Sequence, residues 1–172
     1  IVFIALRARS TSILKRLRSN DITNVGAAAL CDALAVPGGL HACATRVLDL
    51  NGNPLGDIVC DSVCNMVRTN ESVSTLDLGN TQIGTMTLIQ VAKVMWYNAT
   101  IRSLNLENPR SAYDKEETAV YHLAKMVRAN RALSELYMGK HGITDRGAQL
   151  LAEYLEDNAT LRVLDLRCNR IG

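Results

Sequence analysis

An internal repeat of about 28 residues is the feature that most constrains how this chain can fold. Pairs of apolar residues, two positions apart, recur along the chain at intervals of 28, 28, 32 and 28 residues. The pairs are Leu48/Leu50, Leu76/Leu78, Leu104/Leu106, Leu136/Met138 and Leu164/Leu166. Four asparagines keep the same intervals, and they are Asn70, Asn98, Asn130 and Asn158. Two unrelated residue types that share one period indicate an array of repeated units.

Each repeat predicts a strand, a turn and a helix. Residues 46–50, Arg-Val-Leu-Asp-Leu, alternate apolar and polar side chains, as in a strand with one buried face. Val63, Met66 and Val67 have the spacing of a helix with one apolar face. The repeated asparagine ends that helix, and we expect it to adopt the left-handed conformation common after helix C-termini. Units of this kind bury their apolar faces only when they are stacked.

Composition also favours thin repeated layers over one large globule. The chain has 172 residues, of which 48% are hydrophobic and only 4% are aromatic, so its core must be built from aliphatic side chains.

Five basic residues fall in the first twenty positions, and the remainder is mildly acidic, which argues against nucleic-acid binding. The odd number of cysteines, five, favours reduced thiols in a cytoplasmic, intracellular setting.

One repeat carries a recognisable motif, Leu161-x-x-Leu164-x-Leu166-x-x-Asn169-x-Ile171. It resembles the ribonuclease-inhibitor type of leucine-rich repeat, and the resemblance covers about residues 17–172. It implies an α/β leucine-rich repeat solenoid, a horseshoe with a parallel sheet on its concave side and helices on its convex side. We expect residues 1–172 to form a single array of about five to six 28-residue repeats, as a fragment of a longer chain.

Some repeats depart from the family pattern. In the first repeat, Lys15 takes the position that Leu48 has in the next. Three turns have Thr81, Pro109 or His141 in place of the usual asparagine. Since that asparagine normally binds neighbouring backbone, we expect these three turns to be looser or to be bridged differently.

The middle of the chain is similar to one particular intracellular member of this family. The similar segments are residues 104–109, 116–118, 125–126 and 139–141. The similarity implies a non-enzymatic scaffold within a larger assembly. The cellular locations that it suggests are the axoneme of the cilium and the nucleolus.

No catalytic or cofactor motif is present in the sequence. It lacks the P-loop, G-x-G-x-x-G, H-E-x-x-H and G-x-S-x-G patterns, so we expect no enzyme activity, no cofactor and no metal. Cys60 and Cys64 are four residues apart without a second pair of zinc ligands, and we expect them to be packed core thiols. Cys168 is expected in an exposed turn.

The histidines and the single tryptophan are not expected to form a site. His41, His122 and His141 fall in an insertion, a helix and a turn, so we expect ordinary surface or turn residues. Trp96, between Met95 and Tyr97, is expected to pack at a helix end.

The surface expected to bind partners is the concave face of the sheet, onto which alternate strand residues point. Its candidates are Asp49, Asp77, Asn105, Glu107, Glu135, Tyr137, Asp165 and Arg167. Adjacent strands lie about 4.8 Å apart, so Asp49 and Asp77 should be side by side and should favour a cationic neighbour. This acidic track predicts protein partners with basic surfaces, and no nucleic acid, membrane or small-molecule substrate. A second interpretation is that these polar side chains only keep the sheet hydrated.

A second candidate surface is the insertion over residues 107–118, because insertions in repeats often lie at binding edges. Its candidates are Arg110, Tyr113, Asp114 and Lys115. Two other functions remain open beside the interaction scaffold. One is the leucine-rich sensor region of a nucleotide-binding immune receptor, which needs a P-loop domain outside this sequence. The other is a GTPase-activating solenoid of the Ran-activator type.

Overall fold

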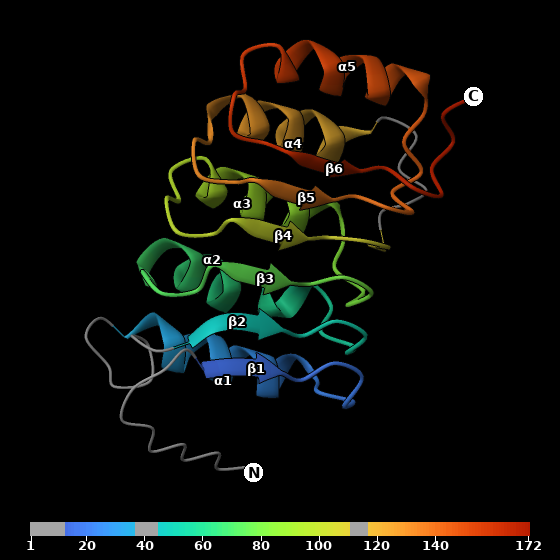
Figure 1. The fold of residues 1–172 in the computed structure, drawn as a ribbon. Helices are drawn as coiled ribbons and strands as arrows, with labels where there is room; N and C mark the ends of the chain where they lie inside the picture. Colours follow the sequence, from blue (N-terminus) through green and yellow to red (C-terminus); the bar gives the residue numbers. More distant parts are fainter. Residues whose placement is uncertain (1–12, 37–44, 111–116) are drawn as a thin grey trace.

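Strands and helices alternate along the chain in a computed structural model, which describes residues 13–36, 45–110 and 117–172 (Figure 1). The strands are β1 (Ile13–Arg16), β2 (Thr45–Asp49), β3 (Thr75–Asp77), β4 (Ser103–Asn105), β5 (Glu135–Tyr137) and β6 (Val163–Asp165). The helices are α1 (Asn24–Ala35), α2 (Cys60–Thr69), α3 (Thr85–Met95), α4 (Thr118–Ala129) and α5 (Asp145–Leu155), with a short 3-10 turn η1 (Asp57–Val59) before α2.

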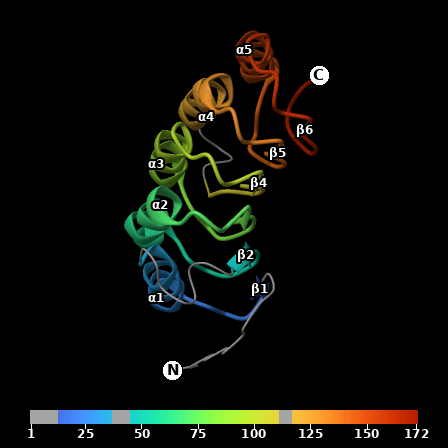
Figure 2. The ribbon, with the colours of Figure 1, turned by 60° about the vertical axis from the view of Figure 1, so that its left-hand side comes forward.

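The strands form one parallel sheet with the order β1-β2-β3-β4-β5-β6, and the helices form a second layer on one side of it. Figure 2 shows the units following a curve, with the helices along the outer side and the strands along the inner side. Strands are thinner than helices, so stacking strand–helix units bends the array toward the sheet. The predicted α/β leucine-rich repeat solenoid is confirmed.

Leucines from successive strands form the centre of the core. Leu48, Leu76, Leu104 and Leu136 are neighbours in the sheet register, and each is completely buried. The buried apolar side chains of the described residues are all aliphatic or sulfur-containing, as the low aromatic content predicted. Lys15 lies opposite Leu48 and is half-buried, so the predicted departure in the first unit is present.

The asparagines that follow the helices do not have the predicted conformation. Asn70 and Asn130 have extended backbones, with φ of −83° and −70°, where a left-handed residue was expected. Their side chains explain the repetition. The Oδ1 of Asn130 accepts the backbone N–H groups of Ala132 and Leu133, and its Nδ2 donates to the carbonyl of Asn98 in the preceding unit. Asn70, Asn98 and Asn158 make corresponding bonds, so these asparagines tie each unit to the one before.

The left-handed conformation occurs instead in the turn after each strand. Positive φ values of 51° to 73° recur there at Ser19, Gly52, Asn80, Asn108, Lys140 and Cys168. From Gly52 onward these positions have the same 28, 28, 32 and 28 residue intervals as the strands. The conformation therefore belongs to the turn geometry of the repeat and not to the helix end.

The turns without asparagine are bridged by other side chains. Thr81 is buried and donates its hydroxyl to the carbonyl of Leu78 at 2.6 Å. His141 is buried as well, with its Nε2 2.8 Å from the carbonyl oxygen of Leu106. Burial lowers the pKa of His141 from 6.5 to about 4. The expectation of different bridging is confirmed for these two turns. His141 lies in the turn, as predicted, but it is buried there and is not a surface residue.

The burial of Trp96 and of Cys60 also differs from expectation. Met95 is fully buried, but Trp96 and Tyr97 are exposed by 41% and 86%, so they do not pack at the helix end. Cys64 is buried, whereas Cys60 is only half-buried, and their sulfur atoms are 4.0 Å apart. Cys168 is exposed, as predicted. His41 lies outside the described residues. None of the described helices has both the length and the apolar character needed to cross a bilayer.

Candidate protein-binding face

The strand register places five of the eight predicted site residues in one row across the inner face of the sheet, while Glu135 is in the next row and Glu107 and Arg167 follow their strands. Asp49 pairs with Asp77, Asp77 with Asn105, Asn105 with Tyr137, and Tyr137 with Asp165. All five side chains are half-exposed, because the residues on either side of them in each strand point into the core. Asp49 and Asp77 are therefore side by side, as the repeat period predicted.

Four members of this row also shape the turn that follows their own strand. A side-chain oxygen of Asp49, Asp77, Asn105 and Asp165 accepts the backbone N–H two residues further on, at 2.8–3.0 Å. These are local turns in which an Asp or Asn side chain replaces a backbone acceptor. The repeated polar residue thus has a structural role in addition to any role in binding.

The predicted repulsion between the first two carboxylates is relieved by a neutral neighbour. Asn51 is buried between the two strands, and its Nδ2 donates to Asp77 at 3.0 Å. Gly79 gives this amide its space, since a Cβ there would lie 2.5 Å from the Nδ2 of Asn51. Among the described residues, neither Asp49 nor Asp77 forms an ion pair.

The acidic track is partly neutralised toward β6. Lys140 pairs with Glu107 at 3.1 Å, and Arg167 pairs with Asp165 at 2.7 Å. Hydrogen bonds from Arg167 lower the pKa of Asp165. The hydroxyl of Tyr137 donates to Glu135 at 3.3 Å, and burial together with this carboxylate raises the pKa of Tyr137. Among the predicted acidic residues of this face, those without an ion pair in the described chain are thus Asp49, Asp77 and Glu135.

Sequence reasoning missed two basic residues that belong to this face. Arg16 of β1 is the register neighbour of Asp49 and is exposed, so a cation begins the row. Lys140 reaches Glu107 from the turn after β5. Arg16 could have been found by extending the strand pairing through the degraded first unit. Lys140 could have been found by noting that its turn lies beside the turn that contains Glu107.

The second candidate surface can be placed only in part. Arg110 is exposed, and its backbone N–H donates to the carbonyl of Ile83 at 2.7 Å. Tyr113, Asp114 and Lys115 lie outside the described residues.

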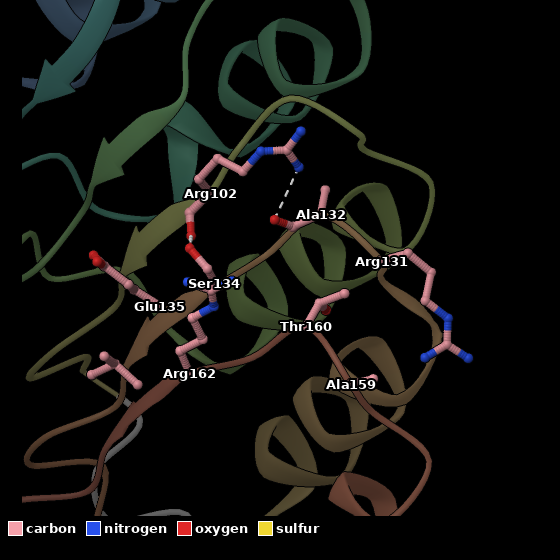
Figure 3. Close-up of a pocket in the computed structure, with 9 residues that line it drawn as sticks. Arg102, Arg131, Ala132, Ser134, Glu135, Ala159, Thr160 and Arg162 are labelled. Atoms are coloured by element: carbon pink, nitrogen blue, oxygen red, sulfur yellow. Dashed lines mark hydrogen bonds between the residues drawn. The ribbon is translucent and has the colours of Figure 1, made fainter.

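A shallow depression of about 560 Å³ lies where the chain enters strands β4, β5 and β6, at the opposite end of the strands from the turns that follow them. Figure 3 shows that its arginines do not converge, because the guanidinium groups of Arg102 and Arg131 point away from each other. Arg102 also donates to the carbonyl of Ala132 in the next unit, at 2.9 Å, and so has a structural partner. In the described part of the chain, no three His, Cys, Asp or Glu side chains are grouped so that they could hold a metal ion.

Comparison with known families agrees with this geometry. Family models described as "Leucine Rich repeat" and "Leucine Rich Repeat" match residues 16–31, 129–152 and 157–172, and residues 45–66. With these matches and its fold, the chain is similar to leucine-rich repeat proteins of the ribonuclease-inhibitor type.

Among individual proteins, it resembles leucine-rich repeat-containing protein 34. The mouse protein of that name is 37% identical over 95 residues, which are 55% of this chain and 23% of the relative. Ribonuclease inhibitor from Sus scrofa is 29% identical over 150 residues, which are 86% of this chain and 31% of the relative. The chain therefore spans less than a third of the length of either relative.

A solved structure has the same fold. Leiomodin-1 actin-binding site 2 superposes with a TM-score of 0.70 at 18% identity, and the match covers 86% of this chain and 79% of that one.

Proposed function

We propose that this chain is a non-enzymatic interaction module that binds a protein partner with a basic surface on the inner face of its sheet. Its setting is a larger intracellular assembly in a reducing compartment such as the cytoplasm, with the cilium and the nucleolus as candidate addresses. The bound partner covers the row from Asp49 to Asp165, and the module supplies no catalytic group of its own.

The in-register row of half-exposed polar side chains carries this proposal. A parallel sheet tied together by hydrogen bonds between units is rigid, so a partner binds it with little loss of conformational freedom. Asp49, Asp77 and Glu135 have no ion pair within the described chain and are available to cations of a partner. Tyr137 stands between Asn105 and Asp165 and offers apolar area with one hydroxyl.

The family relationship supports the same class of function. Ribonuclease inhibitor, as its name states, acts on another protein, and it shares the repeat type over 86% of this chain. The structural roles of Asp49 and Asp77 fit this proposal, because turns that hold the carboxylates in place also prepare them for binding.

The proposal is tested by removing charge while keeping the hydrogen-bond acceptors. Asp49→Asn with Asp77→Asn retains both Oδ1 atoms, so the turns should survive. Binding of an immobilised Lys-Gly repeat peptide should weaken by about tenfold, or roughly 1.4 kcal/mol, and wild-type binding should fall as salt rises. Biolayer interferometry measures both effects, and crosslinking mass spectrometry on native material then identifies the partner.

Asp32→Asn with Asp61→Asn is the matched control, because both residues are exposed on the outer helices α1 and α2. It makes the same change in net charge on the opposite layer. Equal weakening in both double variants would mean that overall charge, and not the sheet face, determines binding. If deletion of residues 110–113 abolishes binding while the sheet variant does not, the insertion is the binding surface.

A second candidate function, the sensor region of an immune receptor, has one observation in its favour. Mouse "NACHT, LRR and PYD domains-containing protein 12" is 27% identical over 157 residues, which are 91% of this chain and 14% of the relative. Sequencing the complete transcript decides between the two, because the sensor function requires a nucleotide-binding domain in the same protein.

A further inference from the structure

Of the five Trp and Tyr residues in the described chain, all but Tyr137 lie on the outer helices or directly after one. Trp96 and Tyr97 follow α3, and Tyr121 lies on α4, and their exposed fractions are 41%, 86% and 39%. The buried core of the described residues contains no aromatic ring. Exposing large apolar side chains costs solubility, and neighbouring exposed aromatics are typical of binding surfaces.

Cations accompany these rings on α4. The Nζ of Lys125 lies 4.4 Å from the ring centroid of Tyr121, and the guanidinium carbon of Arg128 lies 5.8 Å from that of Tyr154 on α5. Tyr121 meets His122 and Tyr154 edge to face, at centroid distances of 5.5 and 6.5 Å. These contacts hold the rings and the lysine in fixed positions on the surface.

The repeat brings a second lysine beside the first. Lys93 occupies on α3 the position that Lys125 occupies on α4, since each lies five residues before the asparagine that follows its helix, Asn98 or Asn130. The axes of packed helices lie about 8–10 Å apart, so these two equivalent lysines extend from neighbouring helices of the outer layer. Burial lowers the pKa of His122, and the positive charges of Lys93 and Lys125 lower it further. Both lysines are therefore close enough to His122 to act on its charge.

Neither lysine is neutralised within the described chain. The ion pairs there are Arg128 with Asp157, Lys140 with Glu107, and Arg167 with Asp165. Lys93 and Lys125 are thus two unpaired cations flanked by exposed aromatic rings. We call Lys93, Trp96, Tyr97, Tyr121 and Lys125 the convex patch.

We propose that the convex patch binds an acidic peptide segment of a partner protein. Two carboxylates of the segment bind Lys93 and Lys125, and apolar side chains of the segment lie on the exposed rings of Trp96 and Tyr121. An extended peptide advances about 3.3 Å per residue, so acidic residues three apart match the spacing of the two helices that carry the lysines. The patch has too few cations for a nucleic-acid backbone, whose binders commonly make 6–10 phosphate contacts. It lies on the opposite layer from the sheet face and does not depend on the function proposed for that face.

Trp96 supplies a direct test, because it is the single tryptophan of the chain and lies within the patch. The probe is a synthetic Glu-Leu-Gly repeat peptide, with a Lys-Leu-Gly repeat as the peptide of opposite charge. The acidic peptide should change Trp96 emission saturably and less strongly at higher salt, and the basic peptide should leave it unchanged. Lys93→Gln with Lys125→Gln should weaken binding by about tenfold, or roughly 1.4 kcal/mol.

Two further variants separate binding from folding. Tyr97→Ala removes a ring that is 86% exposed, so it should keep the wild-type melting curve and weaken peptide binding. Arg68→Gln removes an exposed cation from α2, outside the patch, and should bind as wild type. The proposal is overturned if the acidic peptide gives no saturable change, or if the double lysine variant binds as wild type. It is also overturned if an oligouridylate binds more tightly and competes with the peptide, which would make the patch a nucleic-acid site.

Discussion

The Nε2 atom of His141 lies 2.8 Å from the carbonyl oxygen of Leu106, across the boundary between two repeats. A carbonyl oxygen only accepts, so this nitrogen carries a proton. Burial lowers the pKa of the ring to about 4, so the ring is neutral at pH 7. Asn53 and Asn169 donate at 2.8 and 2.9 Å to the corresponding carbonyl of the repeats before them. His141 therefore donates the same hydrogen bond between repeats as the standard asparagine, but its side chain can also be protonated.

This contact predicts that stability falls in mild acid. The pKa of His141 is about 4 in the folded chain and 6.5 in its usual state, so the unfolded chain binds the proton more readily. The contribution of His141 is fully present above pH 6.5 and is lost as pH falls toward 4. Its full size is about 3 kcal/mol. Urea unfolding measured between pH 7.5 and 4 checks the expected decrease.

The matched variant is His141→Asn, which restores the residue found at positions 53 and 169. It should keep the bond to Leu106 and flatten the pH dependence between 6.5 and 4. His122→Asn controls for the loss of any histidine and should leave most of the slope. A wild-type slope in His141→Asn would show that other groups cause the loss.

The reason for a histidine at this position was not readable from a single repeat. Asn169 uses its Oδ1 to accept the backbone N–H groups of His141 and Ile143, at 2.9 and 3.1 Å. The residue that would donate the first of these bonds to position 141 is Pro109, which has no N–H. An asparagine oxygen at position 141 would therefore lack the first of these two donors. Only the stacking of two units reveals this match.

The repeat period predicts where the site residues lie, but it does not predict what their side chains do. Once the strands are in register, the row through Asp49, Asp77 and Tyr137 follows from counting residues. The roles of polar side chains do not follow, because an asparagine can cap a turn, tolerate a left-handed backbone or bridge two units. Arg16 was missed because the degraded first unit hides its pairing with Asp49.

Leu104→Ala should destabilise the protein by roughly 2–5 kcal/mol, because it empties a fully buried position between β3 and β5. Neighbouring units contact each other directly, so the loss should spread beyond one repeat. Thermal unfolding measures the change. Val25→Ala, at an exposed position of α1, is the control, and an unaltered melting curve for Leu104→Ala would contradict the register described.

Asn130→Ala should cost about 2–4 kcal/mol. The variant leaves two backbone N–H groups without their acceptor and the carbonyl of Asn98 without its donor, while the carbonyl of Met95 keeps only the backbone N–H of Asn98. Asn65→Ala removes an exposed asparagine from α2 and should change stability by less than about 0.5 kcal/mol. Equal effects in chemical denaturation would mean that the asparagines do not tie the units together.

The cysteines should differ in their reaction with a thiol reagent. Cys168 is exposed and should be modified first, followed by the half-buried Cys60. Burial raises the pKa of Cys31 and of Cys64 to about 12, so both should react only as fast as the chain opens. Mass spectrometry of timed, quenched samples gives the order, and early modification of Cys31 would contradict the packing of α1.

Gly79→Ala should disturb the binding face from beneath. The added Cβ would lie 2.5 Å from the Nδ2 of Asn51 and 3.0 Å from that of Asn105, so at least one amide must move. We expect a loss of about 1–3 kcal/mol in stability, as for other overpacked sites, and weaker binding of the Lys-Gly peptide because Asp77 loses its bond from Asn51.

A matched pair of variants tests this cause. Gly172→Ala adds the same methyl group where no atom lies within 4 Å, so its stability should equal that of wild type. Asn51→Ala removes the amide that the new methyl group meets, so the two substitutions should be less than additive when combined with each other. If Gly79→Ala and Asn51→Ala add fully in urea unfolding, the clash between residues 79 and 51 is not the source of the destabilisation.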